Sequence, residues 1–134
     1  MNEDAVRNWI KKADGDLKIG KDEMAVDEPV TDAVCFHMQQ CCEKYLKAFL
    51  IFHGEEVPKT HNLAALVSRC ANLEGDFQKL IDSDIDYLTD FAVDVRYGEE
   101  FYIPSLYEAN QAVIVAETVR NFVLKKFEGK GFKP

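Results

Sequence analysis

The sequence predicts an all-α fold: an up-down four-helix bundle with one additional short helix, formed by a single domain. Three observations support this class. Long segments carry apolar residues every three or four positions, which is the period of a helix. Glycine and proline are sparse and gather between these segments. The regular apolar and polar alternation of a half-buried strand is not found, so a helical bundle fits best.

The first two segments are predicted to be long helices. The segment Glu3–Met24 has one apolar face and a charged face opposite it, which is typical of an amphipathic helix. A loop closed by Pro29 leads to a second helix at Thr31–His53, whose apolar positions cover more than one side. The second helix is therefore expected to be the most buried. Its main inward face is formed by Val34, Met38, Cys41, Tyr45, Ala48 and Phe52.

Three further helices complete the predicted bundle. A short helix at Asn62–Leu73 is followed by a long one at Phe77–Val95, where apolar residues again recur at helical intervals. Ser105 can cap the last helix through its hydroxyl group. We expect residues 1–128 to form the single domain and residues 129–134, GKGFKP, to be a flexible tail.

Composition limits the classes of function. A net charge of −8 argues against sequence-blind binding of nucleic acid, DNA in particular, because such binding needs many cationic side chains. The chain has no long apolar run and no leader with a cleavage site, so we expect a cytoplasmic protein that does not enter membranes. The four cysteines contain no CxxC pair, and no set of four metal-ligand residues is found. We expect neither a metal nor a cofactor.

A polar stripe runs along the otherwise apolar second helix. Intervals of three, four and three residues place His37, Gln40, Lys44 and Lys47 on one face. This pattern has two interpretations. The stripe is a solvated surface, or it lines a groove that binds a phosphate or a partner.

Four aspartates repeat every four residues in the fourth predicted helix: Asp82, Asp86, Asp90 and Asp94. On an α-helix, such a ladder stacks like charges at a cost of a few tenths of a kcal/mol per adjacent pair. Either water solvates the ladder or basic groups lie against it. The candidates for those basic groups are Lys44, Lys47 and Arg96.

Three motifs occur in a fixed order along the chain. They are QQCCEKYLKAFLIFHG at 39–54, PKTHNLAAL at 58–66 and VRYGEEFYIPS at 95–105. Together they resemble the HEPN superfamily, and the resemblance covers nearly the whole chain. It implies a helical bundle similar to the helical domain of aminoglycoside nucleotidyltransferases. It also implies a homodimer, a separately encoded minimal nucleotidyltransferase as partner, and a nucleotide-binding role.

Many HEPN proteins are ribonucleases, frequently toxins, and carry an arginine followed four to six residues later by a histidine. This sequence departs from that pattern, because Arg96 is followed by Tyr97 and no histidine occurs after His61. A metal-independent ribonuclease needs a group that exchanges protons near neutral pH, and histidine is the usual one. We therefore expect no catalytic residues and a non-catalytic, dimeric HEPN module.

The expected ligand-binding residues are Arg96, Tyr97, Lys44, Lys47, Gln40 and His61. An alternative for Arg96 is an ion pair with Asp90 or Asp94 that fastens its loop. One alternative function is a ribonuclease toxin whose proton-transfer group is His61 or a tyrosine. Another is a purely structural protein that regulates a nucleotidyltransferase.

Overall fold

The computed structural model describes residues 3–92, 96–97 and 100–134, without the side chains of residues 92, 96, 97, 100 and 101. Its α-helices are α1 (Glu3–Met24), α2 (Thr31–Phe52), α3 (Leu63–Leu73) and α4 (Leu106–Gly129). Two 3₁₀ helices follow α3, η1 (Gly75–Ser83) and η2 (Ile85–Ala92). A short antiparallel hairpin, β1 (Arg96–Tyr97) with β2 (Glu100–Phe101), pairs Arg96 with Phe101.

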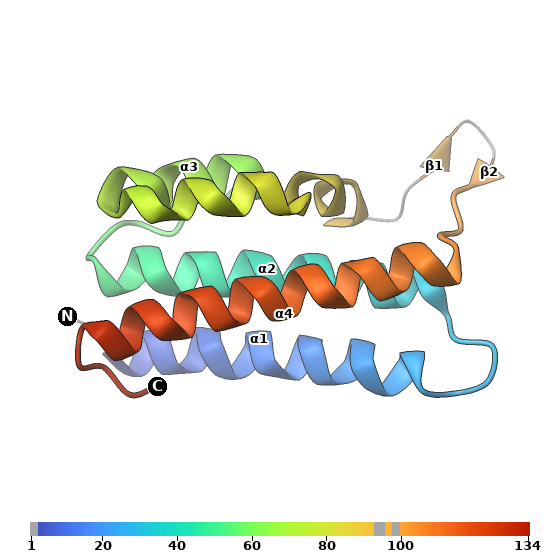
Figure 1. Ribbon diagram of the computed structural model, residues 1–134, viewed down its shortest axis with the longest axis horizontal. Helices are drawn as coiled ribbons and strands as arrows, with labels where there is room; N and C mark the ends of the chain where they lie inside the picture. The colour runs from blue at the N-terminus through green and yellow to red at the C-terminus, as the bar shows by residue number, and fades with distance from the viewer. Residues whose placement is uncertain (1–2, 93–95, 98–99) are drawn as a thin grey trace.

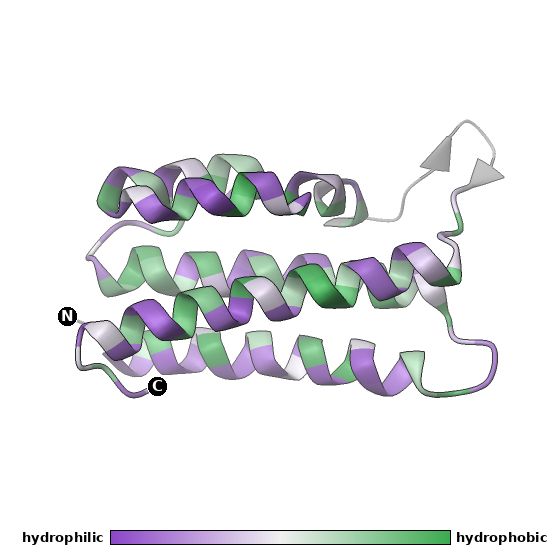
Figure 2. Cartoon of the chain, in the orientation of Figure 1, coloured by the Kyte–Doolittle hydropathy of each residue, from purple (hydrophilic) through white to green (hydrophobic). Residues whose placement is uncertain are grey.

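The helices form the bundle that the sequence predicts. In Figure 1, α1, α2 and α4 lie side by side along the long axis, and α3 with the 3₁₀ segments forms a layer on the other side of α2. α2 is the central element and most of its side chains are buried, whereas α1 keeps a hydrophilic face along its length (Figure 2). Gly20 of α1 leaves space for Met38 of α2, since a Cβ atom there would lie 2.3 Å from Cε of Met38 and the flexible end of that side chain would have to shift.

The ends of two helices follow their sequence signals. Asn62 caps α3, its side-chain oxygen accepting from the backbone N–H of Ala65 at 2.9 Å. Ser105 caps α4 as expected, and Glu108 reaches back to the Ser105 backbone N–H to complete a capping box. No helix among the described residues is long and apolar enough to cross a membrane.

The prediction of one long α-helix at Phe77–Val95 is wrong. The described part of this segment consists of η1 and η2, and they are separated at Asp84, whose φ of 62° lies in the left-handed region. Within each segment the buried residues recur every three positions, which is the 3₁₀ repeat. They are Phe77 and Leu80 in η1, and Ile85, Leu88 and Phe91 in η2.

The aspartate ladder is therefore not formed as predicted. At three residues per turn, side chains four positions apart point about 120° away from each other. Asp82 and Asp86 also lie on different sides of the break at Asp84. Asp82, Asp86 and Asp90 are exposed, and Asp94 lies outside the described residues. Lys44 and Lys47 pair with other carboxylates, so they do not lie against these aspartates.

The C-terminal segment after α4 packs on the bundle through Phe132, and the flexibility expected of residues 129–134 stays a prediction. Phe132 is 5% exposed and its ring packs on the rings of Phe52 and Phe127, at centroid distances of 5.2 Å in both cases. Arg7 of α1 lies over the Phe132 ring and donates to the carbonyl oxygen of Lys133 at 3.1 Å. Aromatic packing thus holds the tail against the ends of three helices.

Candidate functional site

A buried carboxylate on α2 is the centre of a polar network. Gln39, Glu43 and Lys47 follow one another at intervals of four residues, so they lie on one face of the helix. Glu43 is 4% exposed and accepts from Nζ of Lys47 at 2.8 Å and from Nε2 of Gln39 at 3.0 Å. Lys47 and Gln39 are buried as well, so this charged pair is shielded from water.

The loop before α3 adds His61 to this network. Nδ1 of His61 lies 2.7 Å from Oε1 of Glu43, and the His61 carbonyl oxygen accepts from Nε2 of Gln39 at 3.1 Å. Both the ring and the backbone of His61 are therefore fixed by α2. The side chain remains 56% exposed. When the neutral ring donates from Nδ1 to the carboxylate, its Nε2 carries a lone pair that can accept a proton.

Glu43 is ionised at neutral pH. Burial alone would raise the pKa of this carboxyl group, but hydrogen bonds from Lys47, His61 and Gln39 together lower the pKa below its ordinary value. The buried carboxylate and the Lys47 ammonium thus balance each other in charge.

A second buried carboxylate joins α1 to the same face of α2. Asp16 is 8% exposed and lies 2.6 Å from Nζ of Lys44 and 2.9 Å from Nδ1 of His37. The neighbouring Asp14 accepts from the Tyr45 hydroxyl group and from Nε of Arg120 at 3.0 Å. Polar side chains of α2 are thus matched by carboxylates of α1.

The predicted polar stripe is consequently not a solvated surface. Lys47 is almost fully buried, and the side chains of Lys44 and His37 are only 21% and 27% exposed. Gln40 donates to Oε1 of Gln39 at 2.6 Å and so joins the Glu43 network. Four of the six expected site residues, Gln40, Lys44, Lys47 and His61, therefore lie on or beside α2 in two clusters, one around Glu43 and one around Asp16.

An open pocket of about 360 Å³ adjoins Lys44, and it is lined by Ala5, Asn8, Trp9, Lys12 and Lys44. Trp9 is the only tryptophan of the chain, and Nζ of Lys47 lies 6.0 Å from the centre of its ring. Lys12 is exposed and has no acidic partner among the described residues. We call Trp9, Lys12 and Lys44 the Trp9 pocket.

Arg96 and Tyr97 are not placed with these residues. Their side chains lie outside the described part of the structure, but the backbone of β1 lies at the end of the bundle where α2 begins (Figure 1). At that end, the Thr31 hydroxyl group donates to the carbonyl oxygen of Pro104 at 2.7 Å. Lys47 follows Thr31 by 16 residues of helix, which is about 24 Å along the axis.

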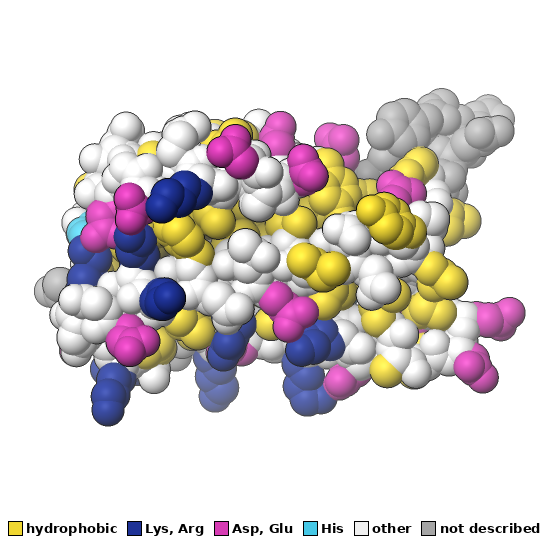
Figure 3. Space-filling model, in the orientation of Figure 1, with side chains coloured by type: hydrophobic (Ala, Val, Ile, Leu, Met, Phe, Trp, Pro, Cys, Tyr) yellow, Lys and Arg dark blue, Asp and Glu magenta, His cyan; other side chains and the backbone are white. Residues whose placement is uncertain are grey.

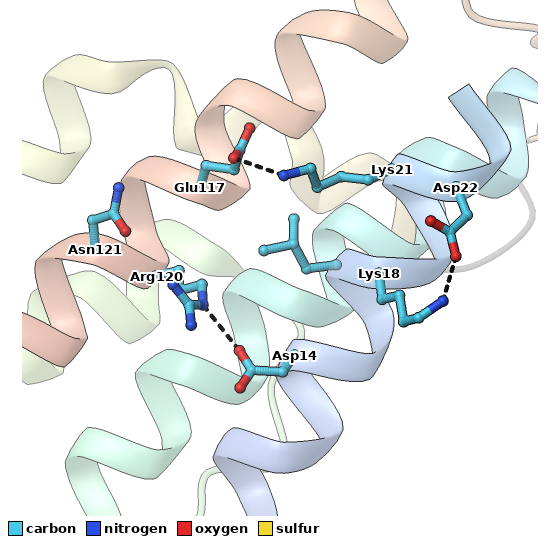
Figure 4. A pocket seen from close by; sticks show the side chains of 8 residues that line it. Asp14, Lys18, Lys21, Asp22, Glu117, Arg120 and Asn121 are labelled. Carbon is cyan, nitrogen blue, oxygen red and sulfur yellow. Dashed lines mark hydrogen bonds and ion pairs between the residues drawn. The ribbon is translucent and has the colours of Figure 1, made fainter. Parts of the chain in front are cut away.

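A second hollow, of about 490 Å³, lies between α1 and α4 (Figure 4). Its charged side chains pair with one another: Arg120 with Asp14 at 3.0 Å, Lys21 with Glu117 at 3.2 Å, and Lys18 with Asp22. Because each of these cations has an acidic neighbour, this hollow has no surplus positive charge for an anion.

Metal and thiol chemistry find no support in the described residues. They contain no group of three or more His, Cys, Asp or Glu side chains that could hold a metal ion. All four cysteines are buried and free, and burial raises the pKa of Cys35 to about 12. A neutral, buried thiol is a poor nucleophile, so these cysteines are core residues.

Comparison with known proteins decides the family. A family model described as the HEPN domain matches residues 6–127. The chain belongs to the HEPN domain family. This HEPN chain also resembles the crystal structure of an archaeal HEPN homologue, with 23% identity over 90% of this chain and 96% of that chain, and a TM-score of 0.71. No curated protein matches this HEPN chain.

Sequence reasoning missed three residues of the site of this HEPN domain: Glu43 as the centre of the network, Asp16 and Trp9. The spacing of Gln39, Glu43 and Lys47 could have indicated the first, because these residues share one face of an apolar helix. Asp16 and Trp9 come from α1, 28 and 35 residues before Lys44. No local pattern links residues that far apart.

Removing one member of the buried pair is expected to destabilise the fold strongly. Lys47→Met leaves the Glu43 carboxylate buried without its cation, and we expect a loss of roughly 3–5 kcal/mol in the free energy of unfolding. The double variant Glu43→Leu/Lys47→Met should lose less free energy of unfolding than Lys47→Met alone or Glu43→Leu alone. Urea unfolding followed by circular dichroism measures both.

The matched control is the exposed pair of Lys18 and Asp22, which has the same spacing but side chains 76% and 66% exposed. Lys18→Met should cost far less stability than Lys47→Met, because water screens an exposed ion pair. Equal losses for Lys18→Met and Lys47→Met would contradict a special role of the buried pair.

The lowered pKa of Glu43 predicts a specific acid sensitivity. The folded-state pKa lies below the ordinary value of 4.5, so the unfolded chain binds this proton more readily than the folded chain. The contribution of Glu43 to stability is thus present above about pH 4.5 and is lost as the pH falls through the folded-state pKa. The free energy of unfolding, measured by urea titration at several pH values, should fall less steeply in acid for Glu43→Gln than for the wild type. Parallel curves for the two proteins would show that protonation of Glu43 does not cause the loss of stability in acid.

Proposed function

We propose that this HEPN domain is a non-catalytic module that binds a nucleotide, or a similar ligand with a phosphate and a flat ring, in the Trp9 pocket. One observation carries the proposal: an aromatic ring and two lysines meet in an open pocket beside the buried Glu43 network. An aromatic face can stack on a base, and ammonium groups bind phosphate oxygens.

The charge of the pocket favours an anion locally, although the chain as a whole carries −8. Lys47 is balanced by Glu43, and Lys44 by Asp16. Lys12 has no acidic partner among the described residues, so it provides the surplus positive charge. Asp16 also fixes the position of Lys44, which lowers the entropy cost of binding.

Two other expected binding residues have an indirect role in this proposal. Gln40 and His61 both connect to Glu43, Gln40 through Gln39. In this proposal they hold α2 and the loop before α3 in place and do not contact the ligand directly. Contacts of Arg96 and Tyr97 with a ligand, the homodimer and the nucleotidyltransferase partner stay predictions, and the proposed binding depends on none of them.

Trp9 provides a direct test of nucleotide binding, because it is the only tryptophan of the chain. We expect ATP to quench the intrinsic fluorescence in a saturable manner, since a stacked base alters the surroundings of the indole. Lys12→Gln should weaken this binding about tenfold, because it removes the cation that has no acidic partner among the described residues.

The control is Lys11→Gln, which changes net charge equally at an exposed neighbour that does not line the pocket. Titrations with adenosine and with tripolyphosphate separate the contributions of ring and phosphate. No saturable quenching by ATP, or equal weakening by both lysine variants, contradicts the proposal.

One observation favours the ribonuclease alternative. The His61 ring is over half exposed and is oriented by an ionised carboxylate at 2.7 Å, which is an arrangement that suits a proton-transfer group. A ribonuclease also needs a cation at the scissile phosphate, and the backbone of β1, which carries the motif arginine Arg96, lies at the end of the bundle where α2 begins.

The leading proposal predicts that purified protein leaves single-stranded RNA intact in the presence of a chelator, because among the described residues His61 contacts no second proton-transfer group beyond its partner Glu43. Gel analysis of labelled RNA measures this. Cleavage that disappears in His61→Gln but persists in His37→Gln would establish the alternative, since His37 also contacts a carboxylate but is largely covered.

A further inference from the structure

A groove of about 570 Å³ lies between the first half of α4 and the two 3₁₀ segments. Its apolar lining includes Ile81, Tyr87, Tyr107 and Ile114, and its acidic lining includes Asp84 and Asp86. We call these six residues the acidic groove. It is separate from the Trp9 pocket, because the two share no lining residue.

Large apolar side chains are unusually exposed beside and within this groove. The exposed fractions are 72% for Ile103, 59% for Leu106, 72% for Tyr107 and 52% for Ile114. Figure 3 shows hydrophobic side chains gathered over this end of α4, below the 3₁₀ segments. Single exposed apolar residues are common, but a contiguous patch with a polar rim is typical of an interaction site.

The charge around the groove has one sign. Its eleven described lining residues include three acidic side chains and no basic one. Asp82, Asp84, Asp86 and Asp90 form no ion pair with any basic side chain among the residues that the structure describes. In Figure 3 the basic side chains lie instead over the other half of α4 and along the lower edge.

The floor of the groove is held in a fixed shape. The Tyr87 hydroxyl group donates to the backbone oxygen of Glu108 at 3.2 Å, which ties η2 to α4. Glu108 is itself fixed by the capping box and by the Tyr102 hydroxyl group at 2.6 Å. Because the groove is already formed, a partner can bind without first ordering it.

We propose that the acidic groove binds a partner protein through an amphipathic segment that carries apolar residues flanked by lysine or arginine. The apolar side chains of the segment cover Tyr107 and Ile114, and its cations lie against Asp84 and Asp86. An anionic membrane or a nucleic acid is repelled by this surface. A second copy on the same face would bring these aspartates onto their own equivalents, which is unfavourable.

The probe is a fluorescein-labelled 18-residue helical peptide of leucine and lysine, and its counterpart has glutamate in place of lysine. We expect the lysine peptide to bind in a salt-dependent manner, and the chemical-shift changes that it causes in the protein to lie in α4, η1 and η2.

Variants of the groove test which side chains bind the peptide. Ile114→Ser and Tyr107→Ser should each weaken binding about tenfold. Asp84→Asn/Asp86→Asn should weaken it by a similar factor and reduce the salt dependence; asparagine suits the left-handed backbone of Asp84.

The chain offers a matched control for each type of change. Ile19→Ser removes an equally exposed isoleucine, 51% against 52%, outside the groove. Glu55→Gln/Glu56→Gln removes two exposed acids in the loop after α2. Neither should alter peptide binding, and circular dichroism checks that every variant is folded.

Three results would overturn the proposal: equal weakening by groove and control variants, equal binding of the glutamate peptide, or chemical-shift changes elsewhere. Analytical sedimentation tests whether a second copy of this chain occupies the groove instead. If the wild type is a dimer and Ile114→Ser a monomer, the groove is occupied by a second copy and the proposal is wrong. Loss of ATP binding in the Trp9 pocket does not affect any of these results.

Discussion

The buried ion pair of Glu43 and Lys47 is the interaction on which the arrangement of this HEPN domain depends. Removing two charges from water costs several kcal/mol per ion before their attraction repays it. Here hydrogen bonds offset the cost, because Gln39 and His61 also contact the Glu43 carboxylate, at its Oε1 atom. The network also fixes the loop that leads to α3. A wholly apolar central helix could slide or rotate against its neighbours. The polar contacts of Glu43 fix the position and rotation of α2.

The sequence alone predicted the four α-helices, but it also predicted an α-helix at residues 77–95, where 3₁₀ segments form instead. Apolar spacing located α1, α2, α3 and α4 to within about one residue at the ends that it defined, because burial follows helical geometry directly. At residues 77–95 the same reasoning chose an α-helix, since short runs of three-residue spacing fit both periods. The distinction depends on Asp84, whose left-handed backbone breaks the segment. Aspartate occurs there less readily than glycine or asparagine, so it gave little warning.

The candidate site was half predictable for a related reason. Lys44, Lys47 and Gln40 were recognised because polar residues on an apolar helix are unusual, and His61 because it belongs to the motif at residues 58–66. Their partners could not be recognised, because Asp16 and Trp9 come from α1 and meet α2 only after folding. Arg96 was grouped with the lysines because of its charge and its place in the motif at residues 95–105, whereas the backbone of β1 lies at the other end of α2.

Charge is distributed over this protein in a way that its net value conceals. On α2, the buried Lys47 and the half-buried Lys44 are each matched by a carboxylate of opposite charge, which leaves Lys12 of α1 to determine the sign of the Trp9 pocket. The acidic surplus lies along η1, η2 and the break between them, where Asp82, Asp84, Asp86 and Asp90 form no ion pair among the described residues. Salt screens exposed charges over about 8–10 Å, so each surface responds mainly to its own neighbours. A chain of net charge −8 can therefore present a cationic pocket on one pair of helices and an acidic groove on another.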